Sequence, residues 1–499
     1  MSERKLNSEL RGDNGASASK SHPWAWVPSL YFAEGIPYFI VNVISVTLFK
    51  RLGMSNGDLA LYTSLLYLPW VIKPLWSPVV DVFKSKRWWI LVMQAIITVS
   101  FALLALSVSP DVFGLSLVIF YVIAFASATH DIAADGFYML ALGEQEQSLF
   151  VGIRSTFYRI SSVFGQGVIV VVAGLLEERM GSIPSAWKVT LLLCGALFAL
   201  LTLWHCRSLP KVERNLAGVH NSDRKAATME AKNAEAGTEG AKAADAGTME
   251  AKNAEAGTEG AKSAEAGTEG AKAADEMPEP CVPAGGKPAV HRGGWGDMWR
   301  VWKTFFMKDG VWLALAFMLL YRLPEALSVK MLTPFLLDPP EAGGLGLSTA
   351  QSGLVYGTAG VIALTIGGIL GGVYAARKGL RKSMWIMALS LALPCAVYLF
   401  LALVQPERMW IVYACVVLDQ FGYGFGFTAY MLYMMKFAEG EFVTSHYAIC
   451  TAFMALSMMI PGLFAGWMQE ALGYVGFFII VMICCLATVF VTLFVRRRC

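Results

Sequence analysis

Long apolar segments separated by short polar loops make up most of this chain. A transmembrane helix needs roughly 20 apolar residues to cross roughly 30 Å of hydrocarbon. Segments of about this length in the first half are Trp24–Phe49, Leu59–Val80, Trp88–Val108, Phe113–Leu142, Leu149–Leu175 and Ala186–Trp204. Those in the second half are Val311–Leu337, Leu354–Ala376, Met384–Val404, Met409–Phe437, Val443–Glu470 and Tyr474–Val495. The pattern predicts an all-α membrane protein with about twelve transmembrane helices in two six-helix halves.

A polar segment separates the two halves. Between Trp204 and Trp295 the chain has no aromatic residue and contains a decamer repeat, so it cannot form a buried core. After it, aromatic residues recur at helical spacing among basic ones, which predicts an amphipathic helix on the membrane surface. The predicted divisions are 1–23, a cytoplasmic N-terminal tail; 24–206, the N-terminal six-helix half; 207–294, a disordered cytoplasmic linker; 295–308, the interfacial amphipathic helix; and 309–499, the C-terminal six-helix half with a short basic tail.

The composition agrees with a lipid environment. The chain is 56% hydrophobic and 15% charged, which lies outside the range of soluble domains. The net charge of +3 is too small to indicate a nucleic-acid partner. The nine cysteines show no paired metal-site spacing, and most lie in apolar segments, so no metal site or disulfide framework is expected.

The positions of basic residues indicate the orientation. Cytoplasmic loops of membrane proteins carry an excess of Lys and Arg. Basic clusters follow the second, eighth and last apolar segments: Lys84, Lys86 and Arg87; Arg377, Lys378, Arg381 and Lys382; and Arg496 to Arg498. The first twenty residues lack the apolar core of a signal peptide, so we expect both termini in the cytosol. The exceptions to the rule, on the opposite side, are Lys50, Arg51, Arg179 and Arg408.

The two basic loops after the second and eighth segments occupy equivalent places in the two halves. An acid at a cytoplasmic helix end, such as Asp81 beside Arg87, can form a charge pair that holds one conformation and breaks in another. Asp135 is also expected near this end, paired with Lys86 or Arg87. The residues predicted to act in gating are Asp81, Lys86, Arg87, Asp135, Arg377 and Arg381.

Several ionisable residues lie inside the apolar segments. A charged side chain at the bilayer centre costs at least a few kcal/mol unless it faces protein or water. Asp131 and Asp135 are four positions apart, so both lie on one face of a helix. The full set is Glu34, Lys73, Asp131, Asp135, Arg154, Arg159, Arg322, Glu325 and Asp419. Together these groups predict an internal polar path.

Other protein classes are less consistent with the sequence. An enzyme would need a nucleophile with its base, a metal cluster or a phosphate loop, and we find no such motif and expect no cofactor. A receptor or scaffold would need a sizeable recognition domain, whereas the only large extramembrane segment is the repeat-bearing linker. We therefore expect a transporter and not an enzyme.

Five motifs resemble the AmpG muropeptide permeases of the major facilitator superfamily. They are Ser127–Ile132 with Asp135, Gly35–Pro37, Lys73–Pro78 ahead of Asp81, Tyr158–Arg159, and Tyr321–Arg322 with Glu325. The resemblance implies a major facilitator fold and a multi-pass protein of the bacterial inner membrane. It implies proton-driven import of a peptidoglycan fragment, an anhydromuramyl peptide, by a monomer. The related acetyl-coenzyme A transporters share several motifs, so acetyl-coenzyme A or another anionic metabolite is the alternative substrate.

Charge and depth suggest roles for these residues. Arg159 and Arg322 belong to opposite halves and are predicted to bind substrate carboxylates. Residues predicted to add hydrogen bonds to the substrate are Tyr158, Gln166, Tyr321 and Gln420. The residues predicted to couple transport to protons are Glu34, Lys73, Asp131 and Glu325, with Lys73 offsetting the charge of Asp131. Pro324 is expected to break the helix between Arg322 and Glu325.

Overall fold

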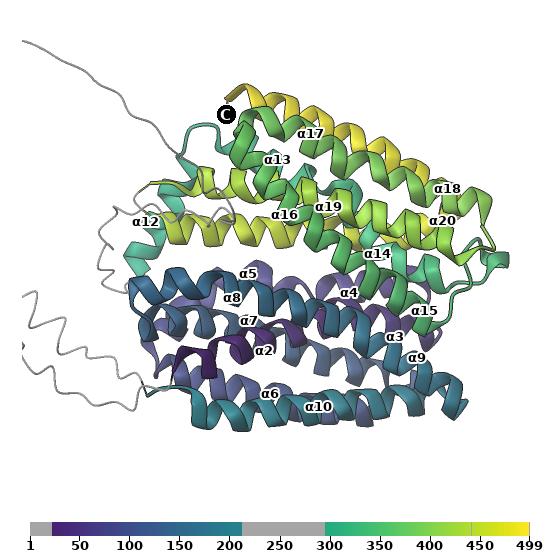
Figure 1. Cartoon of the computed structure of the whole chain (residues 1–499), viewed down its shortest axis with the longest axis horizontal. Helices are drawn as coiled ribbons and strands as arrows, with labels where there is room; N and C mark the ends of the chain where they lie inside the picture. Colours follow the sequence, from purple (N-terminus) through teal and green to yellow (C-terminus); the bar gives the residue numbers. More distant parts are fainter. Residues whose placement is uncertain (1–21, 212–294, 441, 499) are drawn as a thin grey trace, which may run out of the picture. The chain divides into compact units, whose positions relative to one another are not determined.

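The computed structural model describes residues 22–211, 295–440 and 442–498. The described residues all belong to one unit, formed by 1–212 and 277–499. The predicted N-terminal tail up to residue 21 and nearly all of the predicted linker lie outside the described residues. Within them, the structure consists of helices joined by short loops (Figure 1).

The first half forms five helical segments long and apolar enough to span a membrane, together with two shorter helices (Figure 1, purple to teal). Because apolar length sets the span, their positions follow the apolar segments of the sequence closely. They comprise α2 (Val27–Phe39) with η2 (Ile40–Ile44) and α3 (Ser45–Arg51); α4 (Asn56–Leu65) with α5 (Leu68–Val82); α6 (Lys86–Leu106); α7 (Phe113–Ala141); α8 (Glu144–Val163) with η4 (Phe164–Val168) and α9 (Ile169–Met180); and α10 (Ile183–Ser208).

The second half begins with α12 (Trp295–Phe306) and repeats the arrangement (Figure 1, green to yellow). Its spans comprise α13 (Val311–Leu320) with α14 (Leu323–Leu337); α15 (Thr349–Ser352) with η6 (Gly353–Gly360) and α16 (Val361–Lys378); α17 (Leu380–Ala392) with η7 (Leu393–Cys395) and α18 (Ala396–Val404); α19 (Met409–Ala438); and α20 (Val443–Arg498). The long α20 contains two spans, because Gly473 departs from helical geometry with φ of 66°.

Ten helical segments in the described part are long and apolar enough to cross a membrane. This count treats both spans of α20 as one segment. It also omits the second predicted span, which is divided at Leu66–Tyr67 into α4 and α5, both too short to qualify alone. The expected six and six spans are therefore present, although the prediction of one continuous helix over Leu59–Val80 was wrong.

The break in the seventh span lies just before the expected position, at Tyr321–Arg322. Helix α13 ends at Leu320, and Arg322 caps the start of α14 with φ of −99° and ψ of 6°. Pro324 stands in the first turn of α14, where a missing N–H leaves no helical hydrogen bond unmade. The prediction of a break between Arg322 and Glu325 was therefore wrong, and the two residues remain within one helical turn.

The two halves contact each other through close helix crossings. Segment η4 of the first half meets η6 of the second, where a Cβ built at Gly357 would lie 1.9 Å from the carbonyl oxygen of Gln166. Helix α4 meets α20, and α9 meets α15. Small residues at such crossings let helix backbones approach closely within a membrane. Each half keeps its own apolar core, around Phe101 and Phe198 in the first and Phe335 and Phe478 in the second.

Helix α12 occupies most of the range predicted for the amphipathic helix. Its Phe305 is buried against the rings of Phe437, Phe453 and His446, while Trp299 is exposed. The Lys308 ammonium just after it donates to the carbonyl oxygen of Phe437 (2.6 Å), and burial lowers the pKa of Lys308. These contacts attach one face of α12 to the second half, and its place on the membrane surface stays a prediction.

Candidate functional site

The C-terminal half holds a buried ion pair at the break in its first span. Arg322 and Glu325 are both buried, and the guanidinium donates from Nε to Oε2 and from an Nη to Oε1 of the carboxylate, each at 2.7 Å. This two-bond geometry is the strongest arrangement open to an arginine and a carboxylate. The same Nη group donates to the Tyr423 hydroxyl (2.9 Å), and the guanidinium lies 4.7 Å from the centroid of the Phe427 ring. Nε and one Nη group of Arg322 are thus engaged in this conformation.

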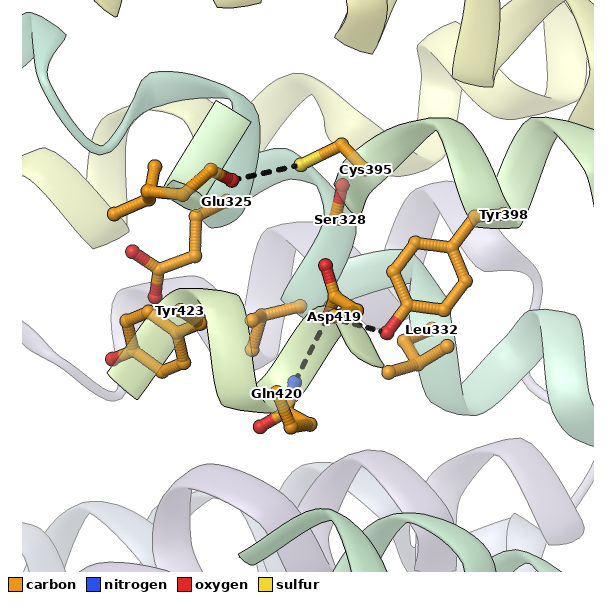
Figure 2. A pocket seen from close by; sticks show the side chains of 10 residues that line it. Glu325, Ser328, Leu332, Cys395, Tyr398, Asp419, Gln420 and Tyr423 are labelled. Atoms are coloured by element: carbon orange, nitrogen blue, oxygen red, sulfur yellow. Dashed lines mark hydrogen bonds between the residues drawn. The ribbon is translucent and has the colours of Figure 1, made fainter. Parts of the chain in front are cut away.

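A small cavity adjoins this pair (Figure 2). Its lining includes Glu325, Ser328, Tyr398, Asp419 and Gln420, and its volume of about 10 Å³ suits about one water molecule. The Tyr398 hydroxyl donates to Asp419 Oδ2 (2.6 Å), and Gln420 Nε2 donates to the same atom (3.1 Å). Gln420 was predicted to bind substrate, but in this conformation its amide donates a hydrogen bond to Asp419.

The N-terminal half holds a second polar cluster. Lys73 Nζ lies 3.6 Å from Asp131 Oδ2, which also accepts from Trp70 Nε1 (3.1 Å). The expected pairing of Lys73 with Asp131 is therefore present. Glu34 is buried nearby, and its Oε2 has no hydrogen-bond partner among the described residues. Its carboxylate lies within electrostatic reach of Asp131 and of the pair described next.

Asp135 pairs within its own half. An Nη of Arg154 lies 2.8 Å from Asp135 Oδ1, and the Tyr31 hydroxyl donates to the same oxygen (3.4 Å). The Arg154 guanidinium also lies 4.6 Å from the centroid of the Tyr31 ring. The prediction that Asp135 pairs with Lys86 or Arg87 was wrong, because α2 packs against both α7 and α8, and Arg154 of α8 reaches Asp135 of α7 there.

The other predicted gating residues have different surroundings. Arg87 donates to the carbonyl oxygens of Leu209 (3.1 Å) and Cys206 (2.6 Å) at the end of α10. Lys86 Nζ donates to the carbonyl oxygen of Val80 (3.3 Å), and its side chain packs on Gly136. Arg377 and Arg381 are exposed, and the side chain of Asp81 lies outside the described residues. The gating roles stay predictions.

The predicted substrate contacts separate into two groups. Arg159 of α8 is partly exposed, lies near Gly368 of the second half, and pairs with no acid among the described residues. Tyr158 lies beside Phe39, and Gln166 Nε2 donates to the Ser162 hydroxyl (2.8 Å). Tyr321 differs from these three. It is fully buried and its hydroxyl donates to the Gly426 carbonyl oxygen (2.9 Å), so in this conformation the hydroxyl does not offer the predicted hydrogen bond to substrate.

A network that the sequence did not reveal joins the two halves at one end of the bundle. Asp338 pairs with Lys50 (2.6 Å) and accepts from the Tyr474 hydroxyl (2.6 Å) and from Asn56 Nδ2 (3.2 Å). Asn56 Nδ2 also donates to Gln469 Oε1 (2.7 Å). We call this end, where Asp338 lies, the Asp338 end, and the opposite end, where Lys86 and Asp135 lie, the Lys86 end.

Glu177 forms a second junction at the Asp338 end. Its buried carboxylate pairs with Arg51 (2.9 Å) and accepts from Trp187 Nε1 (2.7 Å), both in the first half. It also accepts from the Thr349 hydroxyl of the second half (2.7 Å). Lys50 and Arg51 were exceptions to the charge rule for loops. Basic residues on the side where few are expected were thus the one signal in the sequence that pointed to this network.

These features define a membrane carrier, with buried charges in both halves and halves that contact each other at one end. The sequence profile of the Major Facilitator Superfamily matches residues 29–445 and 325–498, and the chain belongs to that family. It is a multi-pass membrane protein and a secondary transporter. Among the described residues, no group of three or more His, Cys, Asp or Glu side chains could hold a metal ion.

Among characterised proteins, the chain is 22% identical over 457 residues to the anhydromuropeptide permease of Escherichia coli (strain K12), covering 90% of this chain and 75% of that protein. It is 20% identical over 485 residues to a putative transporter, AmpG 4, of Rickettsia conorii, covering 92% and 96%. The resemblance to AmpG permeases is therefore confirmed. Among solved structures, a bacterial homologue of the human lysosomal transporter Spinster matches with a TM-score of 0.62 and 13% identity over 96% of this chain and 98% of that one. The nucleoside transporter NupG matches with a TM-score of 0.60 and 12% identity over 95% and 97%.

Proposed function

We propose that this protein is a proton-coupled importer of anhydromuramyl peptides across the bacterial inner membrane. The observation that carries the proposal is the buried Arg322–Glu325 pair, with its two hydrogen bonds of 2.7 Å. Similarity to an anhydromuropeptide permease over 90% of the chain supports the choice of substrate. Anhydromuramyl peptides carry carboxylates, the chemical group that a guanidinium binds best.

The pair suggests how substrate and proton are coupled. A substrate carboxylate that binds Arg322 displaces the Glu325 carboxylate from its two hydrogen bonds. A buried carboxylate without a cation is costly, so Glu325 takes up a proton when it loses Arg322. Arg159 of the opposite half, which pairs with no described acid, is suited to bind a second anionic group of the substrate. One substrate thus binds both halves while one proton binds Glu325.

The direction follows from the distribution of basic residues. The positive-inside rule places the Lys86 end in the cytosol, and with it both termini. The bonds that join the halves at the Asp338 end support a conformation closed on the side opposite the cytosol. One proton moving inward down 100 mV provides about 2.3 kcal/mol, enough for a substrate gradient of roughly fifty-fold.

The decisive experiment is uptake into proteoliposomes, with labelled anhydromuramyl peptide compared with labelled acetyl-coenzyme A. We expect accumulation of the muropeptide only when a proton gradient is imposed. Glu325→Gln should keep substrate exchange but lose accumulation, because the amide permanently resembles the protonated acid. Arg322→Ala should weaken substrate binding at every pH, since a lost charge-assisted hydrogen bond costs about 1.5–3 kcal/mol.

Asp419→Asn is the matched control, because Asp419 lines the same cavity but accepts from the neutral Tyr398 and Gln420. It should retain accumulation. Glu325→Gln protein that still concentrates muropeptide in response to a proton gradient would remove Glu325 from the coupling role. Uptake of acetyl-coenzyme A without uptake of muropeptide would refute the proposed substrate.

A further inference from the structure

Lys330 is a buried cation at the interface between the halves. It lies in α14, five residues after Glu325, and its side chain is 5% exposed. Its Nζ donates to the Thr63 hydroxyl of α4 in the other half (3.1 Å) and lies 5.5 Å from the centroid of the Tyr67 ring. No described carboxylate pairs with it. A lone lysine in a span has no local sequence pattern that would single it out.

Two hydroxyls and a glycine surround Lys330. The Thr63 hydroxyl itself donates to the Leu59 carbonyl oxygen (2.6 Å). The neighbouring Ser64 is fully buried, and its Oγ has no hydrogen-bond partner among the described residues. A Cβ built at Gly462 of α20 would lie 2.3 Å from Ser64 Oγ and 3.2 Å from Lys330 Cε. The Lys330 side chain and the Ser64 hydroxyl thus both lie beside Gly462, the only type of residue that leaves room for both.

This arrangement is costly for a purely structural site. A buried ammonium without a counterion costs several kcal/mol, and a buried hydroxyl without a partner costs about 1–3 kcal/mol. The other three cations of the polar clusters each pair with a carboxylate. Lys73 has Asp131, Arg154 has Asp135, and Arg322 has Glu325. Lys330 has no such carboxylate among the described residues, so another anionic group can take that place.

The position of Lys330 in the bundle suggests at which stage of transport an anionic group binds to it. Along α14 it lies about 7–8 Å beyond Glu325 in the direction of Asp338, on the side of the bundle where the halves are joined. Thr63 and Ser64 belong to the first half, whereas Lys330 and Gly462 belong to the second. A transporter that opens at the Asp338 end must separate these two pairs and admit water and solutes between them.

We propose that Lys330, with the hydroxyls of Thr63 and Ser64, is an anion site that receives a carboxylate of the substrate when the halves part at the Asp338 end. The proposal rests on the proposed function for the direction of entry. The substrate then meets Lys330 before Arg322, and closure of the halves transfers its carboxylate to Arg322. Lys330 is a binding residue of the entry state.

The test uses the full-length protein in proteoliposomes, with labelled muropeptide and labelled acetyl-coenzyme A as two anionic probes. Lys330→Gln should raise the KM for entry from the Asp338 end at least tenfold while kcat changes less than threefold. Lys330→Arg should keep KM within threefold, because it keeps the charge. Lys188→Gln, which removes an exposed lysine at the start of α10, is the control and should change neither constant.

Two further measurements separate a binding role from a structural one. A muropeptide whose carboxylates are amidated should show the same KM with Lys330→Gln as with the wild type. The melting temperature of the substrate-free Lys330→Gln protein should equal or exceed that of the wild type, because a buried unpaired charge has been removed. An unchanged KM for entry of the anionic probes, an equal KM rise for the amidated probe, or a lower melting temperature would overturn the proposal.

Failure of the proposed function gives a different result. Wild-type protein that takes up acetyl-coenzyme A but no muropeptide refutes the proposed substrate. The effect of Lys330→Gln on the KM for acetyl-coenzyme A then still decides the anion site. Wild-type protein that transports neither probe refutes both.

Discussion

The two ends of the helix bundle hold their charged side chains differently, by bonds between the halves at one end and within one half at the other. At the Asp338 end, ionic and hydrogen bonds run between the halves, and the side chains of Lys50 and Asp338 are each 14% exposed. At the Lys86 end, Asp135 and Arg154 pair within one half, with exposed fractions of 38% and 30%. A bond between halves must break when they part, whereas a bond within a half need not. The side-chain bonds at the Asp338 end must therefore break before the halves can part there.

The difference between the two ends also predicts which substitutions shift the balance between conformations. Partly exposed ion pairs contribute about 0–1 kcal/mol, whereas breaking a buried pair by removing one partner costs about 3–5 kcal/mol. Substitutions at the Asp338 end should therefore shift the balance between conformations. Those at the Lys86 end should leave it nearly unchanged. Three substitutions, at Glu177, Asp338 and Asp135, test this contrast with the same probe of opening.

The largest effect is expected for Glu177→Gln. The substitution removes the charge that holds Arg51 and weakens the hydrogen bond that joins α9 to Thr349, a loss of about 3 kcal/mol. The measurement is the alkylation rate of Ser64→Cys, a buried interface position, in a background without the nine native cysteines. The rate should rise steeply. The neighbouring exposed Glu178→Gln is the control and should leave the rate unchanged.

A smaller effect is expected for Asp338→Asn. The amide still accepts from Tyr474 but no longer attracts Lys50, so the loss should be about 1–3 kcal/mol. Alkylation of Ser64→Cys should rise less than with Glu177→Gln, and the melting temperature should fall. Glu341→Gln, an exposed acid in the loop after Asp338, should change neither quantity. An Asp338→Asn protein that labels no faster than Glu341→Gln would show that this network does not close the end.

At the Lys86 end, Asp135→Asn should cost at most about 1 kcal/mol, because solvent screens its pair with Arg154. Alkylation of Ser64→Cys should stay at the wild-type rate. If Asp135→Asn opened the Asp338 end as much as Glu177→Gln does, the contrast between the two ends would be wrong. Calorimetry of the two variants side by side checks the difference in stability.

The smallest effect is expected from deleting 226–274, which removes most of the decamer repeat. The repeat has no aromatic residues with which to form a buried core, so the melting temperature and the uptake rate should match those of the full chain. A deletion variant with lower thermal stability or slower uptake would show that the linker contributes more than a connection.

Local features of the sequence predicted the fold well. Apolar length located the spans, because the hydrocarbon thickness fixes how many apolar residues a helix needs. The three-residue spacing of Arg322 and Glu325 placed them on one helical face, and they pair there. Lys73 and Asp131 are the only opposite charges of the second and fourth spans at matching depth, and they also pair.

Other contacts depended on which helices pack together. Asp135 pairs with Arg154 because α7 and α8 both pack against α2, and loop charge gave no sign of this. Tyr321 stands beside Arg322 in sequence but points into the core. Adjacent residues on a helix face different directions, so a motif does not fix the role of each member.

The sequence by itself determined that this chain spans a membrane many times, in two similar halves with buried charges, because hydropathy and charge are properties of each segment and its solvent. Only the tertiary structure decided that Asn56 meets Asp338, 282 positions away, and that Lys330 meets Thr63, 267 positions away. Such pairs arise where the two halves touch. They depend on the crossing of helices that are distant in sequence and on the conformation the transporter has adopted, and neither is encoded in any local pattern.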